Sequence, residues 1–265
     1  MKTTNRFFCV IVIALFLLST TSITAQDDAK RPEYITVTTM YWNKDYDGTM
    51  DEWKAMEKEY RDKVISKNEH VMSTNYYTHL LTPNSNEVLA VSVYPTWDDI
   101  DKAASRSADL EKEAWSDGEA RKAFLTKLNS AFAIYHSDEI YATLPGAKQL
   151  AEAPTKDMVL YVRTNKMAYP DNGSQKEFDE LNKKYLDNVV YKNEYIKGYW
   201  PNAHAWGHDK RDYIEAFMID SLGDLEKLFD RNTELMNEAL TKDEAKAMGK
   251  YFGKHGDAVY TYVHL

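Results

Sequence analysis

The chain is acidic: its 265 residues include 33 Lys or Arg and 42 Asp or Glu, which gives a formal charge of −9 at pH 7. A chain with this charge repels nucleic acid and anionic membranes, and no basic patch offsets the total. The sequence contains no G-x-G-x-x-G, P-loop, G-x-S-x-G or H-E-x-x-H motif, which argues against nucleotide-dependent chemistry and the common hydrolase mechanisms. We therefore expect neither a nucleic-acid nor a membrane partner.

The N-terminal segment has the pattern of a cleaved secretory signal peptide. Lys2 and Arg6 precede an apolar run over residues 7–18, and small and polar residues follow. This run is shorter than the ~20 apolar residues that a membrane-spanning helix needs. We expect residues 1–25 to be removed and the protein to be exported, to the periplasm or beyond. The loss of two basic residues and no acid takes the formal charge from −9 to −11. The only cysteine, Cys9, lies in this segment, so we expect no disulfide.

The rest of the sequence repeats with an offset of 125 residues. Gly48–Trp53 is similar to Gly173–Phe178, and His204 follows His79 by the same 125 residues. Near the end, HSDEIYATL and HGDAVYTYV match at an offset of 119, which indicates a short deletion. A repeat of this length indicates a duplicated unit. We predict two units, residues 33–144 and 158–265, joined by a linker over residues 145–157.

The first unit opens with a predicted strand and helix. Tyr34–Trp42 is β-branched and aromatic, as strands prefer. Thr49, followed three residues later by Glu52, predicts a capping box, in which a hydroxyl and a carboxylate bind the free N–H groups at a helix start. The phrase KNEH at Lys67–His70 ends this helix, and we expect Asn68 to adopt the left-handed conformation there.

Two strands, a long helical segment and a last strand complete the first unit. Val71–Leu81 and Val88–Tyr94 are predicted strands joined by the turn TPNSN. Thr96 with Asp99 predicts the cap of a second helix, which continues through an amphipathic segment rich in Ala, Lys and Glu. A final strand is expected near Glu139–Leu144.

The second unit repeats this order. Its predicted strands are Met158–Thr164, Ile196–Trp206, Tyr213–Ile219 and Ala258–His264. Ser174 with Glu177, and Ser221 with Asp224, predict its two helix starts. The order β-α-β-β-α-β in both units is the ferredoxin-like order, an α+β class in which helices cover one face of an antiparallel sheet.

The other face of each sheet determines how the two units meet. By the strand period of two, we assign the following residues to the face away from the helices: Tyr34, Thr36, Thr38, Ala90, Ser92, Tyr94, Val159, Tyr161, Arg163, Glu215, Phe217 and Ile219. The second-unit set is too apolar and aromatic to face water. We therefore expect the two sheets to bury these faces against each other in a pseudo-dimeric α/β barrel, which is compatible with higher oligomers.

This duplicated order resembles the dimeric α/β-barrel superfamily, with both subunits fused in one chain. The sequence is similar to antibiotic-biosynthesis-monooxygenase-like and EthD-like domains. It is also similar to exported bacterial proteins with W/Y-x-x-x-H followed by D-x-x-K, here Trp200–His204 and Asp224–Lys227. The resemblance covers residues 33–265 and concerns element order more than a catalytic motif. It implies a small aromatic or isoprenoid ligand, inside the barrel or between sheet and helices. It requires no cofactor, although some members bind or degrade haem.

His79 and His204 are the leading candidates for chemistry, because the duplication places them at equivalent points of two strands. An imidazole can act as an acid, a base or a ligand near neutral pH. The alternative is structural, with each histidine forming a hydrogen bond at a hairpin. His204 and His208 have the i, i+4 spacing of some metal sites, but Gly207 places them on a strand and a turn, so we expect no metal.

Tyr161, Arg163 and Glu215 form a predicted polar group in the second unit, where the first unit has only Thr and Ala at the matching positions. Such a group can be a site, although an Arg–Glu pair is also a common structural salt bridge. Trp200 and Trp206 have the size and polarity to stack on a ring compound, and the alternative is that they belong to the core.

The resulting hypothesis is an exported protein that binds a small, largely apolar ring compound in a barrel pocket. The residues expected around this ligand are His79, Tyr161, Trp200, Trp206 and Glu215. The sequence leaves open whether the protein is an enzyme. In cofactor-independent, oxygenase-like chemistry, His204 would accept a proton and Arg163 would face an oxyanion. The alternative is a non-catalytic periplasmic binding or interaction protein whose barrel is filled by side chains.

Overall fold

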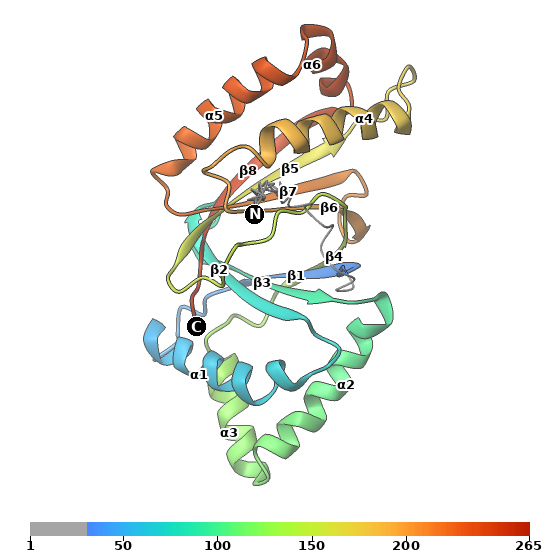
Figure 1. Cartoon of the computed structure of the whole chain (residues 1–265). Coiled ribbons are helices and arrows are strands. Elements are labelled where there is room, and N and C mark those ends of the chain that lie inside the picture. Colours follow the sequence, from blue (N-terminus) through green and yellow to red (C-terminus); the bar gives the residue numbers. More distant parts are fainter. Residues whose placement is uncertain (1–30) are drawn as a thin grey trace, which may run out of the picture. The chain divides into compact units, whose positions relative to one another are not determined.

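Eight antiparallel strands close into a barrel in the computed structural model, which describes residues 31–265 (Figure 1). Around the barrel the strands follow the order β1-β3-β2-β8-β5-β7-β6-β4. Their bounds are β1 Tyr34–Tyr41, β2 Ser73–Leu81, β3 Glu87–Tyr94, β4 Ser137–Thr143, β5 Met158–Met167, β6 Gly198–Trp206, β7 Asp212–Ile219 and β8 Phe252–Tyr262. The expected signal peptide, residues 1–25, lies outside the described residues.

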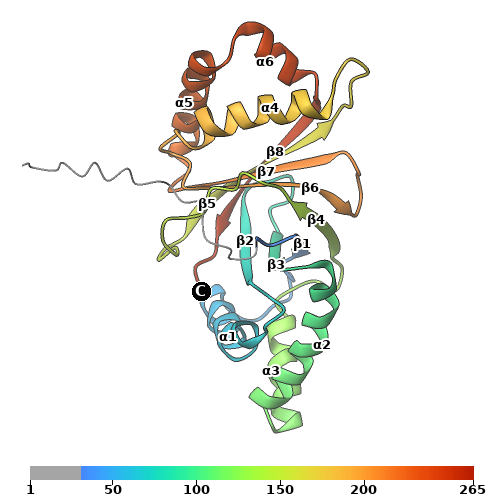
Figure 2. The same cartoon turned by 45° about the vertical axis from the view of Figure 1, so that its right-hand side comes forward.

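Two groups of helices cover opposite sides of this barrel, with α1, α2 and α3 on one side and α4, α5 and α6 on the other, as Figure 2 shows. Their bounds are α1 Met50–Lys63, α2 Trp97–Ala114, α3 Gly118–Asn129, α4 Gln175–Tyr185, α5 Asp224–Ala239 and α6 Lys242–Gly249. A 3₁₀ turn, η1 (Ile65–Lys67), follows α1, and a π-helical turn, η2 (Leu186–Val190), follows α4. The predicted α+β class and element order are confirmed, with each long second helix divided in two.

We call residues 33–144 the first half and residues 158–265 the second half. Each half contributes four consecutive strands, and the halves meet at two seams of the barrel, where β2 pairs with β8 and β4 pairs with β6. At one seam His79 lies opposite Tyr260, and at the other His204 lies opposite Tyr141. Backbone hydrogen bonds between the halves therefore close the barrel that the sequence predicts.

The assignment of sheet faces made from the sequence is wrong in both halves. Val37 and Leu89, expected to face helices, pack inside the barrel with Met158 and other residues of the opposite half. Tyr161 and Phe217, expected to face inward, pack instead against residues of α4, η2 and α5. The period of two separates the faces correctly. It does not tell them apart, because the helix-facing side of the second half is as apolar as the barrel interior.

The first helix of each half begins where the sequence predicts, but only the first half has the full capping box. The Thr49 hydroxyl accepts from the Glu52 N–H at 3.2 Å, and the Glu52 carboxylate accepts from the Thr49 N–H at 2.7 Å. In the second half, Ser174 caps α4, while the Glu177 carboxylate accepts from Lys250 and the Tyr251 hydroxyl. The Tyr251 hydroxyl accepts from the Ser174 N–H at 2.9 Å and thus replaces the reciprocal half of the box.

The predicted caps of the next helices are also only partly correct. Thr96 is the N-cap of α2, but its hydroxyl donates to Asp99 at 2.6 Å instead of accepting from the backbone. Helix α5 has Gly223 as its N-cap, and Ser221 lies outside it with its hydroxyl 2.7 Å from Asp224. In both helices the hydroxyl therefore binds the carboxylate of the first turn and not a backbone N–H.

The phrase KNE occurs at Lys67–Glu69 and again at Lys192–Glu194, and its asparagines do not end the helices in the way we predicted. Asn68 has φ −87°, not a left-handed value, and its side-chain N–H₂ donates to the carbonyl of Ala103 on α2 at 2.8 Å. Asn193 is fully buried and donates in the same way to Leu228 on α5 at 3.1 Å. Each asparagine ties the end of one helix to the next helix, which explains why the duplication kept it.

Candidate functional site

A row of three charged residues crosses the helix-facing side of the second-half sheet. Arg163 on β5 lies between Glu215 on β7 and Asp257 on β8, because it is the register partner of both. The Arg163 side chain is 27% exposed, so solvent and a ligand can reach it, whereas Glu215 is buried. The period of two also places Tyr161 on this side, where it packs in the cluster of residues against the helices.

The buried carboxylate of Glu215 is fully partnered. Its Oε2 accepts from Asn165 at 2.9 Å, and its Oε1 accepts from the Tyr199 hydroxyl at 3.0 Å. The guanidinium of Arg163 lies 3.8 Å from Oε2. A buried charge requires partners of this kind, because desolvation of an unpaired carboxylate costs several kcal/mol.

From Arg163 the hydrogen bonds continue outward to the surface. Arg163 Nε donates to the Tyr161 hydroxyl at 3.1 Å, and that hydroxyl donates to Asp257 Oδ1 at 2.5 Å. Asp257 Oδ2 lies 3.1 Å from Nδ1 of His255, and both of these side chains are about half exposed. We call the continuous series His255, Asp257, Tyr161, Arg163 and Glu215 the polar chain. It connects an accessible imidazole to a buried carboxylate.

Burial and neighbouring charges shift the ionisation of the polar chain. Burial, with the Asp257 hydrogen bond, raises the pKa of Tyr161 to about 12. Burial lowers the pKa of Arg163, but the nearby Glu215 and Tyr161 raise it by more. The net effect is a raised pKa for Arg163. At neutral pH the tyrosine is therefore a hydrogen-bond donor and the arginine a fixed cation.

Aromatic rings surround the polar chain. The Arg163 guanidinium lies 5.7 Å from the ring centroid of Tyr161 and 6.0 Å from that of Phe217. Phe229 on α5 packs edge-on against Tyr161 at 5.3 Å and is 39% exposed. The π-helical turn η2 contributes Leu186 and Val190 to the same layer, and such turns are frequent near functional sites. An accessible cation beside exposed aromatic surface can bind a ligand that carries both a ring and a negative charge.

The first half contains only the outer end of this arrangement. His136 Nε2 lies 3.2 Å from Asp138 Oδ2, whereas the matching H-x-D of the second half makes this contact through Nδ1 of His255. The Thr38 hydroxyl donates to Asp138 at 2.6 Å, and Thr38 stands where the second half has Arg163. The duplication therefore provides an internal control, with the same dyad but neither the arginine nor the buried glutamate.

The structure does not bring His204 and Arg163 together, because they lie on opposite faces of the sheet. His204 lies opposite Tyr141, whose own partner in β1 is Ile35, on the face that lines the barrel interior. Its Nε2 is buried, with no hydrogen-bond partner among the residues that the structure describes. His79 also faces the interior, and its Nδ1 lies 2.7 Å from the Thr82 hydroxyl, next to the hairpin turn. This contact matches the structural alternative considered for that residue.

The two tryptophans of the predicted site are also separate from the polar chain. Trp200 packs against the cluster of residues inside the barrel, and its Nε1 lies 3.4 Å from Gln149. Trp206, at the end of β6, is 67% exposed. Tyr161, Arg163 and Glu215 are thus the members of the predicted set that the structure brings together.

Sequence reasoning missed His255 and Asp257 as site residues. Both lie in the HGDAVY motif, which was used to align the halves but not considered as chemistry. The reversed assignment of sheet faces hid their position beside Tyr161. A usable signal existed, since an H-x-D motif occurs at matching places in both halves.

The part of the chain that the structure describes contains neither a candidate metal site nor a candidate membrane-spanning helix. Within residues 31–265 no group of three or more His, Cys, Asp or Glu side chains has a geometry that could hold a metal ion. None of the helices in that range is both long and apolar enough to cross a membrane.

Comparison with known proteins supports the fold. No protein-family model matches the chain, and no curated protein sequence matches it. Among solved structures, a candidate monooxygenase from Fusobacterium nucleatum subsp. nucleatum is 12% identical, with a TM-score of 0.56 over 88% of this chain and 93% of that one. A candidate monooxygenase from Lactobacillus acidophilus is 9% identical, with a TM-score of 0.51 over 87% of this chain and 93% of that one.

A chlorite dismutase from Candidatus Nitrospira defluvii is also similar, at 14% identity and a TM-score of 0.54 over 87% of this chain and 91% of that one. Likeness at such low identity concerns the arrangement of strands and helices and not the site residues. The fold of the chain is that of the ferredoxin-like dimeric α/β-barrel proteins.

Proposed function

We propose that the chain binds a small ring compound with an ionisable hydroxyl group at the polar chain, and removes the proton of that group. The observation that carries the proposal is the series of contacts from exposed His255 to buried Glu215. Hydrogen bonds join Asp257, Tyr161 and Arg163, and ion-pair contacts of 3.1 Å and 3.8 Å join His255 to Asp257 and Arg163 to Glu215. It occurs in one half of a duplicated fold, while the other half keeps only the outer dyad. The hypothesis of a site in the second half is retained, but its position moves from the barrel interior to the helix-facing side.

The arrangement assigns a role to each group. Asp257 holds Nδ1 of His255 as a donor, which leaves Nε2 to accept the proton of a bound hydroxyl. The resulting imidazolium is stabilised by Asp257, and the ring oxyanion lies near the fixed positive charge of Arg163. Phe229 and Tyr161 offer ring surface for the ligand. A ring oxyanion is electron-rich and is the form that reacts with oxygen, so the proposal includes cofactor-independent, oxygenase-like chemistry.

One comparison and one feature of the polar chain support this reading of the chemistry. The similar candidate monooxygenases share the fold over most of both chains. The polar chain also requires no group beyond the protein's own side chains to move a proton. Export is part of the proposal, supported by the signal-like pattern of residues 1–25.

Haem is a poorer fit to these residues. Inside the barrel, Tyr260 lies opposite His79 and buried Tyr141 lies opposite His204, so a large side chain is next to each histidine. Nδ1 of His79 is also engaged by Thr82. On the helix-facing side, His255 is accessible but held by Asp257. We therefore derive no step through haem. A hemin titration of wild type, His255→Ala and His204→Ala tests this assignment, with no Soret shift expected.

The proposal is tested with p-nitrophenol, whose phenolate absorbs visible light and whose phenol does not. At a pH below the ionisation of the free compound, we expect protein to increase the phenolate absorbance in a saturable way. His255→Ala should abolish this increase, because the proton acceptor is gone. Tyr161→Phe should weaken it, because Asp257 and Arg163 lose the hydroxyl that joins them.

His136→Ala is the matched control, since it removes the same dyad from the half without Arg163 and Glu215. It should leave the absorbance change intact. Equal loss in His136→Ala and His255→Ala, or no saturable change in wild type, would contradict the proposed site. Thermal unfolding of each variant separates loss of binding from loss of folding.

A non-catalytic role is the second candidate, and one observation favours it. The barrel interior is filled by buried side chains, and the Arg163–Glu215 pair is satisfied as it stands. In that case the polar chain would be a structural network. Arg163→Met with compensating Glu215→Met would then preserve both stability and any ligand response, whereas the proposal expects the ligand response to be lost.

A further inference from the structure

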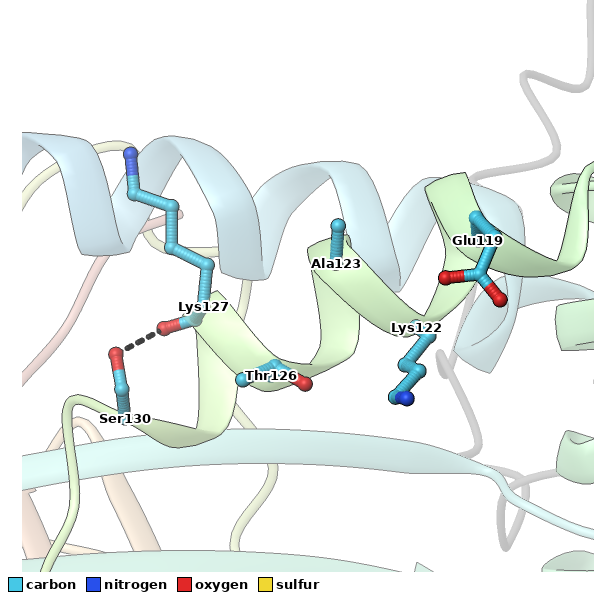
Figure 3. A pocket seen from close by; sticks show the side chains of 6 residues that line it. All are labelled: Glu119, Lys122, Ala123, Thr126, Lys127 and Ser130. Atoms are coloured by element: carbon cyan, nitrogen blue, oxygen red, sulfur yellow. Dashed lines mark hydrogen bonds between the residues drawn. The ribbon is translucent and has the colours of Figure 1, made fainter.

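A small aromatic hollow lies in the first half, at the junction of β1 and α1 and remote from the polar chain in the sequence. It is lined by Trp42, Asn43, Tyr46, Met50 and Trp53 and has a volume of about 190 Å³. A cavity of ~150 Å³ is enough to hold benzene. The hollow therefore has room for one substituted ring. A second hollow, along α3, is lined by Glu119, Lys122, Ala123, Thr126, Lys127 and Ser130 (Figure 3) and has no aromatic side chain in its lining.

The walls of the aromatic hollow are held in place by the core beneath them. Trp53 is 1% exposed, and Trp42 packs edge-on against it with ring centroids 5.0 Å apart. Trp42 also stacks on Phe132 at 5.2 Å. Asn43 donates to the carbonyl of Ser130 at 3.0 Å, which fixes the chain after β1. Met50 is 44% exposed at the rim and can rearrange around a ligand, as flexible methionine side chains do.

One of the residues that line the hollow carries a buried polar atom that lacks a partner. The Tyr46 hydroxyl makes no hydrogen bond to any residue within the described part of the chain. The Trp53 indole N–H, by contrast, lies close enough to the Glu57 carboxyl to lower the pKa of that carboxyl against the effect of burial. A buried hydroxyl without an acceptor is destabilising, so a ligand that brings an acceptor to Tyr46 recovers this energy.

The charges near the hollow select against anions. Glu52 and Asp47 lie close enough to Tyr46 to raise the pKa of its hydroxyl further than burial does alone. A carboxylate ligand would meet the same repulsion. The acceptor that fits is therefore an uncharged one, such as a carbonyl oxygen.

We infer that this hollow is a second ligand site, which takes an uncharged single-ring compound bearing a carbonyl group. The aromatic walls provide the apolar contact, and the Tyr46 hydroxyl provides the hydrogen bond. The corresponding positions of the second half are Met167, Asp171 and Phe178, so the duplication did not keep this site. Its ligand class differs from that of the polar chain, which takes an ionisable hydroxyl.

Acetophenone is the probe, followed through the indole ¹H–¹⁵N signals of the tryptophans by NMR. We expect a saturable shift of the Trp53 signal, which Trp53→Phe identifies by its absence. Ethylbenzene, which has the ring but no acceptor, and benzoate, which is anionic, should bind at least about five-fold more weakly, the effect of about one hydrogen bond. Equal binding of either compound would overturn the inference.

Tyr46→Phe is the variant that tests the hydroxyl, and its fold is expected to persist because that hydroxyl has no partner to lose. It should weaken acetophenone binding about five-fold without lowering the unfolding temperature. His255→Ala should leave acetophenone binding unchanged, which separates this site from the polar chain. Unchanged acetophenone affinity in Tyr46→Phe, or the absence of a saturable shift in wild type, would contradict the inference.

Discussion

Replacing Glu57 with Gln should make the stability of the protein less dependent on pH. Glu57 lies on α1 and is 4% exposed, and burial raises the pKa of its carboxyl from 4.5 to about 7. Nearby groups, Tyr76, Trp53 and Arg61, oppose the rise but do not cancel it. A glutamate with this environment is neutral in the folded chain under conditions where it ionises in the unfolded chain.

The sign of the effect follows from proton binding. Below pH 4.5 the carboxyl is protonated in both states, so it has no effect on the pH dependence. Between pH 4.5 and about 7 the unfolded chain has released its proton while the folded chain keeps it, so the free energy of unfolding falls as the pH rises. At ~1.4 kcal/mol per pH unit, the free energy of unfolding falls by about 3 kcal/mol across this pH range.

Urea unfolding at pH 4.5, 6 and 7.5 measures the effect. We expect Glu57→Gln to match wild type at pH 4.5 and to be more stable by up to about 3 kcal/mol at pH 7.5. Glu59→Gln, an exposed change on the same helix, is the control and should follow wild type within ~0.5 kcal/mol. A constant difference between Glu57→Gln and wild type at all three values would refute the reasoning.

Three further predictions follow from the fold. Thr49→Ala should cost about 1 kcal/mol by denaturant midpoint, as should Ser174→Ala, because each hydroxyl caps a helix; no change in either would mean that these caps contribute nothing. Asn193→Ala should cost about 2 kcal/mol, since it removes the buried side-chain donor that the Leu228 carbonyl and Asn232 Oδ1 share, while the neighbouring Lys192→Ala should be nearly neutral; equal costs would contradict the bridging role. Residues 33–145 expressed alone should associate or aggregate, because β2 and β4 lose their partners β8 and β6, and a stable monomer of that segment in sedimentation would argue against the shared barrel.

Element order was predictable from the sequence because local signals agree with the tertiary structure. The Thr49 box, the Ser174 cap and the aromatic strands lie where propensity and capping chemistry place them. The 125-residue repeat made each unit a check on the other. β8 illustrates the limit: it begins at Phe252, ahead of the predicted Ala258, because its polar start is held by pairing with β5 and not by its own composition.

The site was harder to predict because its residues are joined by sheet pairing. Arg163, Glu215 and Asp257 come from three strands far apart in the sequence, and only the register makes them neighbours. Tyr161, Arg163 and Glu215 were nevertheless found, since their polarity breaks an apolar pattern. His204 was grouped with them because equal positions in a duplication do not reveal which face of a sheet a side chain occupies.

The most direct test of the central proposal is where a phenol binds. With p-nitrophenol bound, and phenylalanine and tyrosine rings selectively ¹³C-labelled, intermolecular NOEs report which side chains lie within a few ångströms of the ligand. The polar-chain site predicts NOEs to Phe229 and Tyr161, which are lost in His255→Ala and kept in His136→Ala. NOEs to Tyr77 and Tyr260 would place the ligand inside the barrel and contradict the account.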